Sequence, residues 1–226
     1  PFVGGAKNVA EVYRGRDFIR DIVPIASISR QPEVLLANAS LPAKTFLELI
    51  AHAKANPGKI TMASPGNGSI GHLSGELLKI MAGIDLVHVP YRGTAPALTD
   101  LLAGHVQISF AGMAGSIEYL KTGQLRGLAV TTTARSEALP DIPAVGEFVP
   151  GYEAIALFGI GAPGNTPGEI VDRLNKEINA AIADPGMKAK LAAIGGEPMV
   201  WLIRLELTPP GGELVVLPTY TAMLAL

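Results

Sequence analysis

Short apolar runs alternate along the chain with segments in which apolar residues recur every three or four positions. The apolar runs are typical of buried strands and cover 22–29, 34–37, 59–64, 86–89, 106–110, 125–130 and 155–161. Amphipathic helices are predicted between or after them, around 41–53, 72–81, 97–102, 115–121, 167–182 and 186–194. This alternation predicts an α/β fold in which the sheets are largely parallel.

Composition and charge narrow the classes of protein to which the chain can belong. Hydrophobic residues make up 48% of the 226 positions and charged residues 17%, which is typical of a globular chain. The formal net charge is −2 and no basic tail is present, so no binding to nucleic acid is expected. No apolar stretch approaches the roughly 20 residues that cross a bilayer, and the opening residues lack a signal-peptide pattern. We therefore expect a soluble protein.

The residue types needed for most catalytic and metal sites are absent or scattered. The chain has no cysteine, which excludes disulfides, thiolate nucleophiles and cysteine–zinc sites. Its four histidines, His52, His72, His88 and His105, lack metal-ligand spacing. No carboxylate pair and no nucleophile–base pair stands out. We therefore expect neither an enzyme nor a metal or cofactor site.

Three strand-to-helix turns are the best candidates for a ligand site, at 64–72, 90–95 and 111–116. In parallel α/β sheets, ligands bind just beyond the carboxyl ends of the strands, where the amino ends of helices point outward. The free N–H groups and the dipole of a helix amino end favour an anion. A pocket built from several such turns suits a carboxylate.

The turn at 64–72 also matches the dinucleotide fingerprint G-x-G-x-x-G, with Gly66, Gly68 and Gly71. The fingerprint requires an acidic residue at the end of the next strand, but Asp85 lies before that strand. Arg92 at the strand's end could instead contact the phosphate of NADP. An NADP-dependent oxidoreductase therefore remains the alternative hypothesis.

The same turn allows two further interpretations. Ser69 lacks the serine-hydrolase elbow G-x-S-x-G, because Asn67 occupies the position of the first glycine. The glycines could also serve only to permit a tight turn. We favour an anion-binding turn, because Ser64, Asn67, Ser69 and His72 surround the expected exposed N–H groups with polar side chains.

Charged and polar residues near these turns have simpler explanations. Tyr91 and Arg92 are of a kind that more often lies on the surface than contacts a ligand. Glu76 and Asp100 are expected to face solvent on amphipathic helices. None of these four residues is needed to explain an anion site.

Several segments share a pattern with one known family: 17–26, 66–76 (GNGSIGHLSGE), 87–93 (VHVPYRG), 96–102, 128–131, 135–136, 139–143 and 150–153. They resemble the Bug (Bordetella uptake gene) family of periplasmic receptors, the solute-binding components of tripartite tricarboxylate transporters. The resemblance covers roughly residues 17–198. It implies a small carboxylate ligand (a di- or tricarboxylate, an acidic amino acid or an aromatic acid), membrane transporter subunits as partners, a periplasmic location and a monomer.

The resemblance also implies a type II periplasmic-binding-protein fold, α/β, with two lobes whose central sheets are flanked by helices. Residues 1–36 would form part of the first lobe, 37–154 the second lobe, and 155–226 the return to the first. The strands that cross between the lobes are expected near 34–38 and 153–158. Compared with the family, the first lobe is incomplete, and the tail after Met199 does not follow the family pattern.

The family pattern implies a set of ligand-binding residues around the three turns and in the first lobe. They are Gly4, Gly5, Ser64, Gly66, Asn67, Gly68, Ser69, His72, Tyr91, Gly93, Thr94, Ala111 and Phe158. Family ligands are held chiefly by backbone N–H groups, hydroxyls and waters. No catalytic or metal-binding residue is implied.

Overall fold

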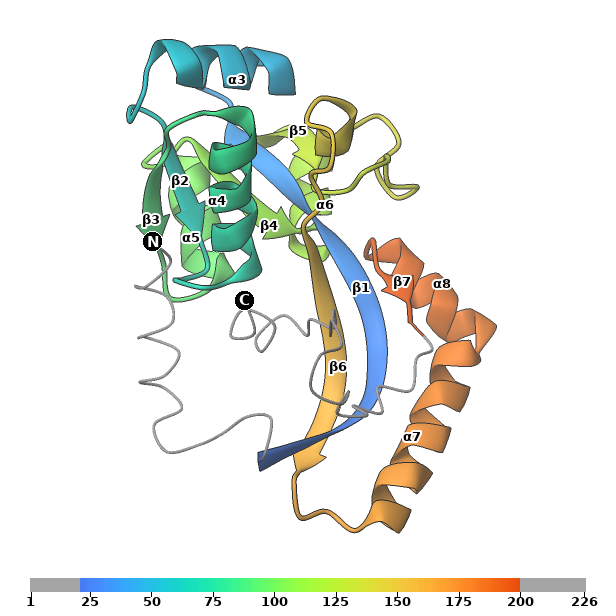
Figure 1. Ribbon diagram of the computed structural model, residues 1–226. Helices are drawn as coiled ribbons and strands as arrows, with labels where there is room; N and C mark the ends of the chain where they lie inside the picture. Colours follow the sequence, from blue (N-terminus) through green and yellow to red (C-terminus); the bar gives the residue numbers. More distant parts are fainter. Residues whose placement is uncertain (1–20, 200–226) are drawn as a thin grey trace. The chain divides into compact units, whose positions relative to one another are not determined.

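The computed structural model describes residues 21–199, and Figure 1 shows its helices and strands. The chain forms two compact units, which are described separately here. Unit 2 is Pro32–Ile155, and unit 1 contains the residues before and after it. The unit boundaries fall a few residues from those expected for the lobes, and the assignment of each segment to a lobe stays a prediction.

Unit 2 contains most of the described helices and strands. The long strand β1 (Ile22–Asn38) begins in unit 1 and ends in unit 2. The elements that follow are α3 (Phe46–Ala55), β2 (Thr61–Ser64), α4 (Ile70–Ala82), β3 (Val87–Pro90), α5 (Thr94–Ala103), β4 (Ile108–Gly112), α6 (Met113–Lys121), β5 (Leu125–Val130) and the short 3-10 helix η1 (Val145–Glu147).

The strands of unit 2 are hydrogen-bonded in the order β3-β2-β4-β1-β5. Strand β2 is parallel to β3 and β4, whereas β1 is antiparallel to both β4 and β5. The predicted largely parallel arrangement is therefore correct for three neighbouring strands and wrong for the longest one. A run of apolar residues reports burial but carries no information about strand direction.

The two strands predicted at 22–29 and 34–37 are one continuous strand in the structure. The polar residues Arg30 and Gln31, followed by Pro32, break the apolar pattern without ending the strand. Proline removes one backbone donor but its fixed φ is compatible with extended backbone. Directly after it, the Glu33 amide donates to the Thr131 hydroxyl at 2.8 Å, so the extended backbone continues.

Both faces of the unit 2 sheet are covered, which explains the unbroken apolar run in β1. Leu35 and Ala37 belong to one buried cluster, with side chains of α3 and α4 such as Phe46 and Leu78. Val34 and Leu36 belong to a second cluster, with side chains of α5 and α6. Successive side chains of a strand point to opposite faces, so a strand between two helical layers must be apolar at every position.

Unit 1 contains the first part of β1 and the elements after Ile155: β6 (Ile155–Pro163), α7 (Gly168–Ala183), α8 (Pro185–Ala193) and β7 (Glu197–Pro198). Strands β6 and β7 both pair with β1. The predicted inward face of α7 is only partly buried, because Ile182 is covered whereas Ile170 and Leu174 are 46% and 40% exposed. The sheet in the described part of unit 1 is narrow, so it covers only part of the apolar face of α7.

Within residues 21–199, no helix combines the length and the apolar character needed to pass through a membrane. The same residues contain no group of three or more histidine, aspartate or glutamate side chains placed to hold a metal ion.

Candidate functional site

The structure brings the three predicted turns together at one edge of the unit 2 sheet. Strands β3, β2 and β4 are parallel neighbours, so the turns that follow them leave the sheet at the same edge. Two backbone bonds join the first two turns: the Tyr91 amide donates to the Ser64 carbonyl and the Gly93 amide to the Pro65 carbonyl, both at 2.9 Å. The third turn adjoins them, since a Cβ added at Gly71 would lie 2.7 Å from the Phe110 carbonyl of β4.

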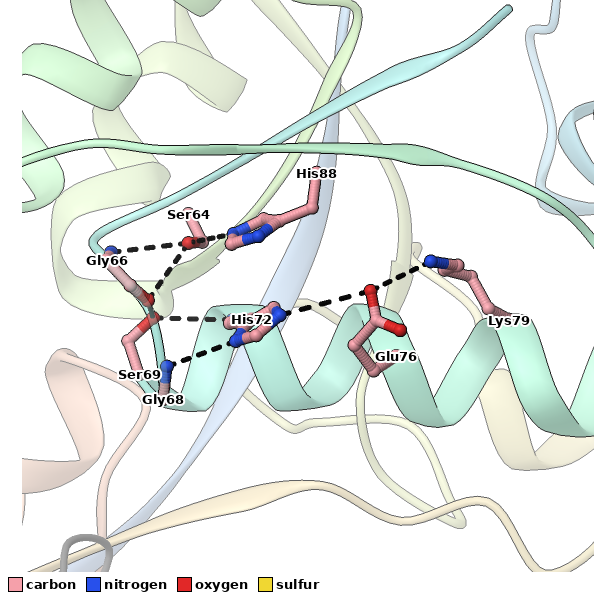
Figure 2. Close-up of polar contacts among 8 residues, drawn as sticks. All are labelled: Ser64, Gly66, Gly68, Ser69, His72, Glu76, Lys79 and His88. Atoms are coloured by element: carbon pink, nitrogen blue, oxygen red, sulfur yellow. Dashed lines mark hydrogen bonds and ion pairs between the residues drawn. The ribbon is translucent and has the colours of Figure 1, made fainter. Parts of the chain in front are cut away.

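The 65–71 turn between β2 and α4 owes its shape to two glycines and one serine. Gly66 and Gly68 have φ values of 147° and 77°, which only glycine adopts without strain. Ser69 is the N-cap of α4, and its hydroxyl donates to the Gly66 carbonyl at 2.7 Å (Figure 2). The glycine pattern that resembles a dinucleotide fingerprint therefore has a local structural reason.

Three of the six amides of this turn, those of Gly66, Gly68 and Ser69, bond to protein atoms, which corrects part of the expectation of exposed N–H groups. The Gly66 amide donates to the Ser64 hydroxyl at 3.2 Å, and the Gly68 amide to Nδ1 of His72 at 3.0 Å. The His72 amide donates to the Ser69 hydroxyl at 3.3 Å. The polar side chains expected to surround the free amides bond to them instead. Among the described residues, no acceptor is found for the amides of Asn67, Ile70 and Gly71.

The helices that begin at the other two turns keep their first amides free of side-chain caps. The N-cap residues of α5 and α6 are Gly93 and Gly112, and neither helix has a side-chain cap. The first amide of α5, at Thr94, therefore remains available to an outside acceptor, whereas Met113 at the start of α6 is completely buried. A helix amino end with uncapped amides favours a bound anion.

A cluster of polar side chains behind the 65–71 turn escaped sequence analysis (Figure 2). The rings of His72 on α4 and His88 on β3 are stacked, with centroids 3.9 Å apart and an interplanar angle of 11°. Nε2 of His88 lies 2.6 Å from the Ser64 hydroxyl. Glu76 lies 2.9 Å from the Lys79 ammonium and 3.9 Å from Nε2 of His72, so it is part of this cluster rather than a solvated helix residue.

Burial disfavours the charged form of both histidine rings. It lowers the pKa of His72, with Glu76 opposing the effect and Lys79 adding to it. The pKa of His88 is lowered to about 4, first by burial and then by the neighbouring His72 ring. The spacing of His72, Glu76 and Lys79 along one helix could have been recognised in the sequence. The position of His88 depends on the register of β3 against β2, which the sequence does not reveal.

A buried carboxyl group lies beneath the first turns of α4 and was also missed. Glu33 is 3% exposed, and the Ser74 hydroxyl donates to its Oε2 at 3.3 Å. The hydroxyl of Tyr152, in turn, donates to the Ser74 carbonyl at 2.9 Å. Burial raises the pKa of Glu33 to about 7, and the Ser74 bond opposes this only in part. Its position in the polar break of β1 gave no sign that it would be buried.

The hydroxyl of Tyr91, a predicted ligand contact, is bonded within unit 2. It donates to Oδ2 of Asp100 at 2.6 Å, and Oδ1 of Asp100 lies 3.3 Å from His105. Burial, followed by the bond to Asp100, raises the pKa of Tyr91 to about 12. Asp100 therefore holds Tyr91 in place, in contrast to the purely solvated role expected for it.

The remaining predicted residues are placed as follows. Ser64 and Ala111 are buried, Asn67 and Thr94 are exposed, and Gly93 is half-buried. Phe158 belongs to unit 1, where its side chain is 48% exposed. Gly4 and Gly5 lie outside the described residues. The role of each predicted residue in ligand binding stays a prediction.

Several curated proteins are similar to this chain in sequence. A Pseudomonas sp. strain P51 protein, named the UPF0065 protein in the tcbD-tcbE intergenic region, is 38% identical over 178 residues. This match covers 78% of the present chain but only 53% of the relative. The chain thus spans about half the length of the curated relatives it matches.

Two solved structures share the fold of the chain. R. palustris Rpa4515 with adipate is 40% identical with a TM-score of 0.79, and the match covers 82% of this chain and 63% of that one. MatC from Rhodopseudomonas palustris with bound malate is 26% identical with a TM-score of 0.74, covering 84% of this chain and 66% of the other. The likeness agrees with the predicted α/β periplasmic-binding-protein fold.

The family description "Tripartite tricarboxylate transporter family receptor" matches residues 11–201. This range contains all three turns and both units' described elements. The chain therefore belongs to the tripartite tricarboxylate transporter receptor family, in agreement with the resemblance of its motifs.

Proposed function

We propose that this chain is the ligand-capturing part of a periplasmic receptor that binds a small carboxylate. It acts without catalysis, as a monomer, and presents its ligand to membrane transporter subunits. The receptor family supports the transport role, and the adipate and malate named for two structural relatives support a dicarboxylate as ligand. The ligand is bound at the edge of the unit 2 sheet where the three turns meet.

The observation that carries this proposal is the convergence of helices α4, α5 and α6 at that edge. Two of these helices begin at glycines without side-chain caps, so amides in their first turns can donate to a bound carboxylate as a shared anionic partner. Exposed Asn67 adds a side-chain amide beside them, and Ser69 holds the turn through its bond to the Gly66 carbonyl. No arginine is required, because backbone N–H groups and helix dipoles supply the positive potential.

No observation within residues 21–199 favours the NADP-dependent oxidoreductase. The glycines of the 65–71 turn are explained by positive φ and by close packing against β4. NADP nevertheless belongs in the ligand screen, because the two hypotheses predict opposite responses.

Small dicarboxylates are expected to raise the melting temperature of the full chain. A ligand that binds only the folded state stabilises it by mass action, so a concentration of about 100 times Kd should raise Tm by roughly 5 °C or more. The measurement is a thermal-shift screen of mono-, di- and tricarboxylates that includes adipate, malate and NADP. Stabilisation by NADP alone would contradict the proposal.

Replacing both Ser69 and Asn67 with alanine is expected to weaken adipate binding by about tenfold or more, because a polar contact and the α4 cap are lost together. The cap alone contributes about 1 kcal/mol to stability. Thr45→Ala is the matched control, because Thr45 caps α3 through the same bond, to the Glu48 amide, away from the turns. Calorimetric titration with adipate should show normal affinity for Thr45→Ala. Equal affinity in both variants would remove the 65–71 turn from the site.

A further inference from the structure

The bond between the Gly68 amide and His72 constrains the protonation state of the histidine. The amide donates to Nδ1 of the ring at 3.0 Å, so Nδ1 must carry a lone pair and the ring must be neutral. Gly68 is buried and lies in the left-handed region of φ, at 77°. The ring of His72, which lies in α4 directly after the turn, thus holds the middle of the 65–71 turn in place.

We propose that His72 is a positioning residue for the ligand: its neutral ring holds the 65–71 turn in the conformation that binds a carboxylate, and protonation of the ring releases the turn. This inference rests on the proposed function. It adds a pH-dependent control of affinity, with tight binding at neutral pH and weak binding in acid. No contact between His72 and the ligand is required.

Protonation of His72 has a defined structural consequence. A charged imidazole has N–H groups on both nitrogens, so Nδ1 would face the Gly68 amide with donor against donor. On the opposite side of the ring, Nε2 lies 3.9 Å from Oε1 of Glu76, and a charged ring would gain an ion pair there. The protonated ring therefore loses its hydrogen bond to the Gly68 amide and is attracted toward the Glu76 carboxylate.

The charged and titratable groups around His72 set the direction of the effect. His88 on β3 stacks on its ring, and Glu76 and Lys79 lie beside it on α4. On the opposite side of α4, Glu33 and Tyr152 contact Ser74 and do not contact either ring. Because burial lowers the pKa values of both rings, their contribution to stability is complete above pH 6.5 and is lost as the pH falls through the lowered values.

Adipate affinity should separate this role from a merely structural one. The full chain is titrated with adipate at several pH values from about 7.5 down to about 4, because burial lowers the pKa of His72 below its ordinary value. Three variants are compared: His72→Ala, which removes the acceptor; His72→Asn, whose side-chain oxygen replaces it without titrating; and His52→Asn, the same change at a histidine of α3, away from the three turns. Ionisation of adipate itself affects all of the proteins equally.

At neutral pH, His72→Ala should bind adipate roughly tenfold more weakly than the unchanged chain, and His72→Asn should restore most of that affinity. On acidification, the unchanged chain and His52→Asn should lose about tenfold more affinity than His72→Asn. Identical pH profiles for His72→Asn and the unchanged chain would overturn the proposal.

A measurement without ligand keeps this inference separate from the proposed function. In the NMR spectrum of the free chain, the Gly68 amide signal should shift as His72 titrates, and it should not shift in His72→Asn over the same pH range. If the Gly68 signal shifts in the unchanged chain but not in His72→Asn, and neither adipate nor malate binds, the proposed function fails and the anchoring of the turn stands. A Gly68 signal that is unaffected by pH in the unchanged chain would refute the anchoring itself.

Discussion

Replacing Glu33 with glutamine is expected to stabilise the protein at pH 8 by up to about 3 kcal/mol. Burial raises the pKa of this carboxyl from 4.5 to about 7, so the folded state favours its neutral form. The difference between these pKa values corresponds to about 3 kcal/mol when the group is ionised in both states. Glutamine is neutral at every pH and has nearly the same shape, so it avoids the burial of a charge.

The sign of the pH dependence follows from the raised pKa. The stabilising contribution of neutral Glu33 is complete below pH 4.5 and is lost as the pH rises through about 7. The unchanged chain should therefore lose stability over this interval, and Glu33→Gln should lack that loss. Urea unfolding at several pH values measures both curves. Exposed Glu118 on α6 provides the control, because Glu118→Gln should leave the pH dependence unaltered. A Glu33→Gln protein that is less stable at pH 8 would show that the ionised carboxylate is stabilised by its surroundings.

Replacing Gly71 with alanine is expected to destabilise the protein by about 1–3 kcal/mol or more, because the added methyl group overpacks the core. The Cβ would lie 2.7 Å from the Phe110 carbonyl, a backbone atom of β4 that cannot rotate away, and 3.2 Å from the Pro65 ring. Helix α4 would have to move away from the sheet. The same shift would displace the 65–71 turn, so adipate binding should weaken as well.

Gly115→Ala is the matched control for this substitution. Gly115 lies in helix α6, and no atom lies within 4 Å of the position that its Cβ would take. Alanine should therefore stabilise that helix by up to about 1 kcal/mol through its higher helix propensity. Urea unfolding of the two variants should give changes of opposite sign. Similar stabilities for both would indicate that α4 can move away from β4 without loss.

The α/β fold could be predicted because its signals are local. Apolar runs report buried strands, and apolar residues at helical spacing report helices that cover them. The position of the three turns followed from where strands end and helices begin. The direction of β1 could not be predicted in this way, because a fully buried strand is apolar whether its neighbours are parallel or antiparallel.

The candidate site was predicted at the level of segments but not of individual bonds. Ser64, Ser69 and His72 were recognised as polar residues within or directly beside the 65–71 turn. Their side chains, however, fold back onto the amides of Gly66, Gly68 and His72. Each bond depends on a local conformation with several possible acceptors at similar sequence distance, so spacing alone does not identify the partner.

By itself, the sequence determined the alternation of strands and helices and the receptor family. These properties depend on neighbouring residues or on motifs that are read along the chain. Only the tertiary structure decided that Glu33 is buried beneath α4 and that His88 stacks on His72. Burial and ring contacts bring together residues 16 or more positions apart, and their partners depend on strand direction and register, which no local pattern encodes.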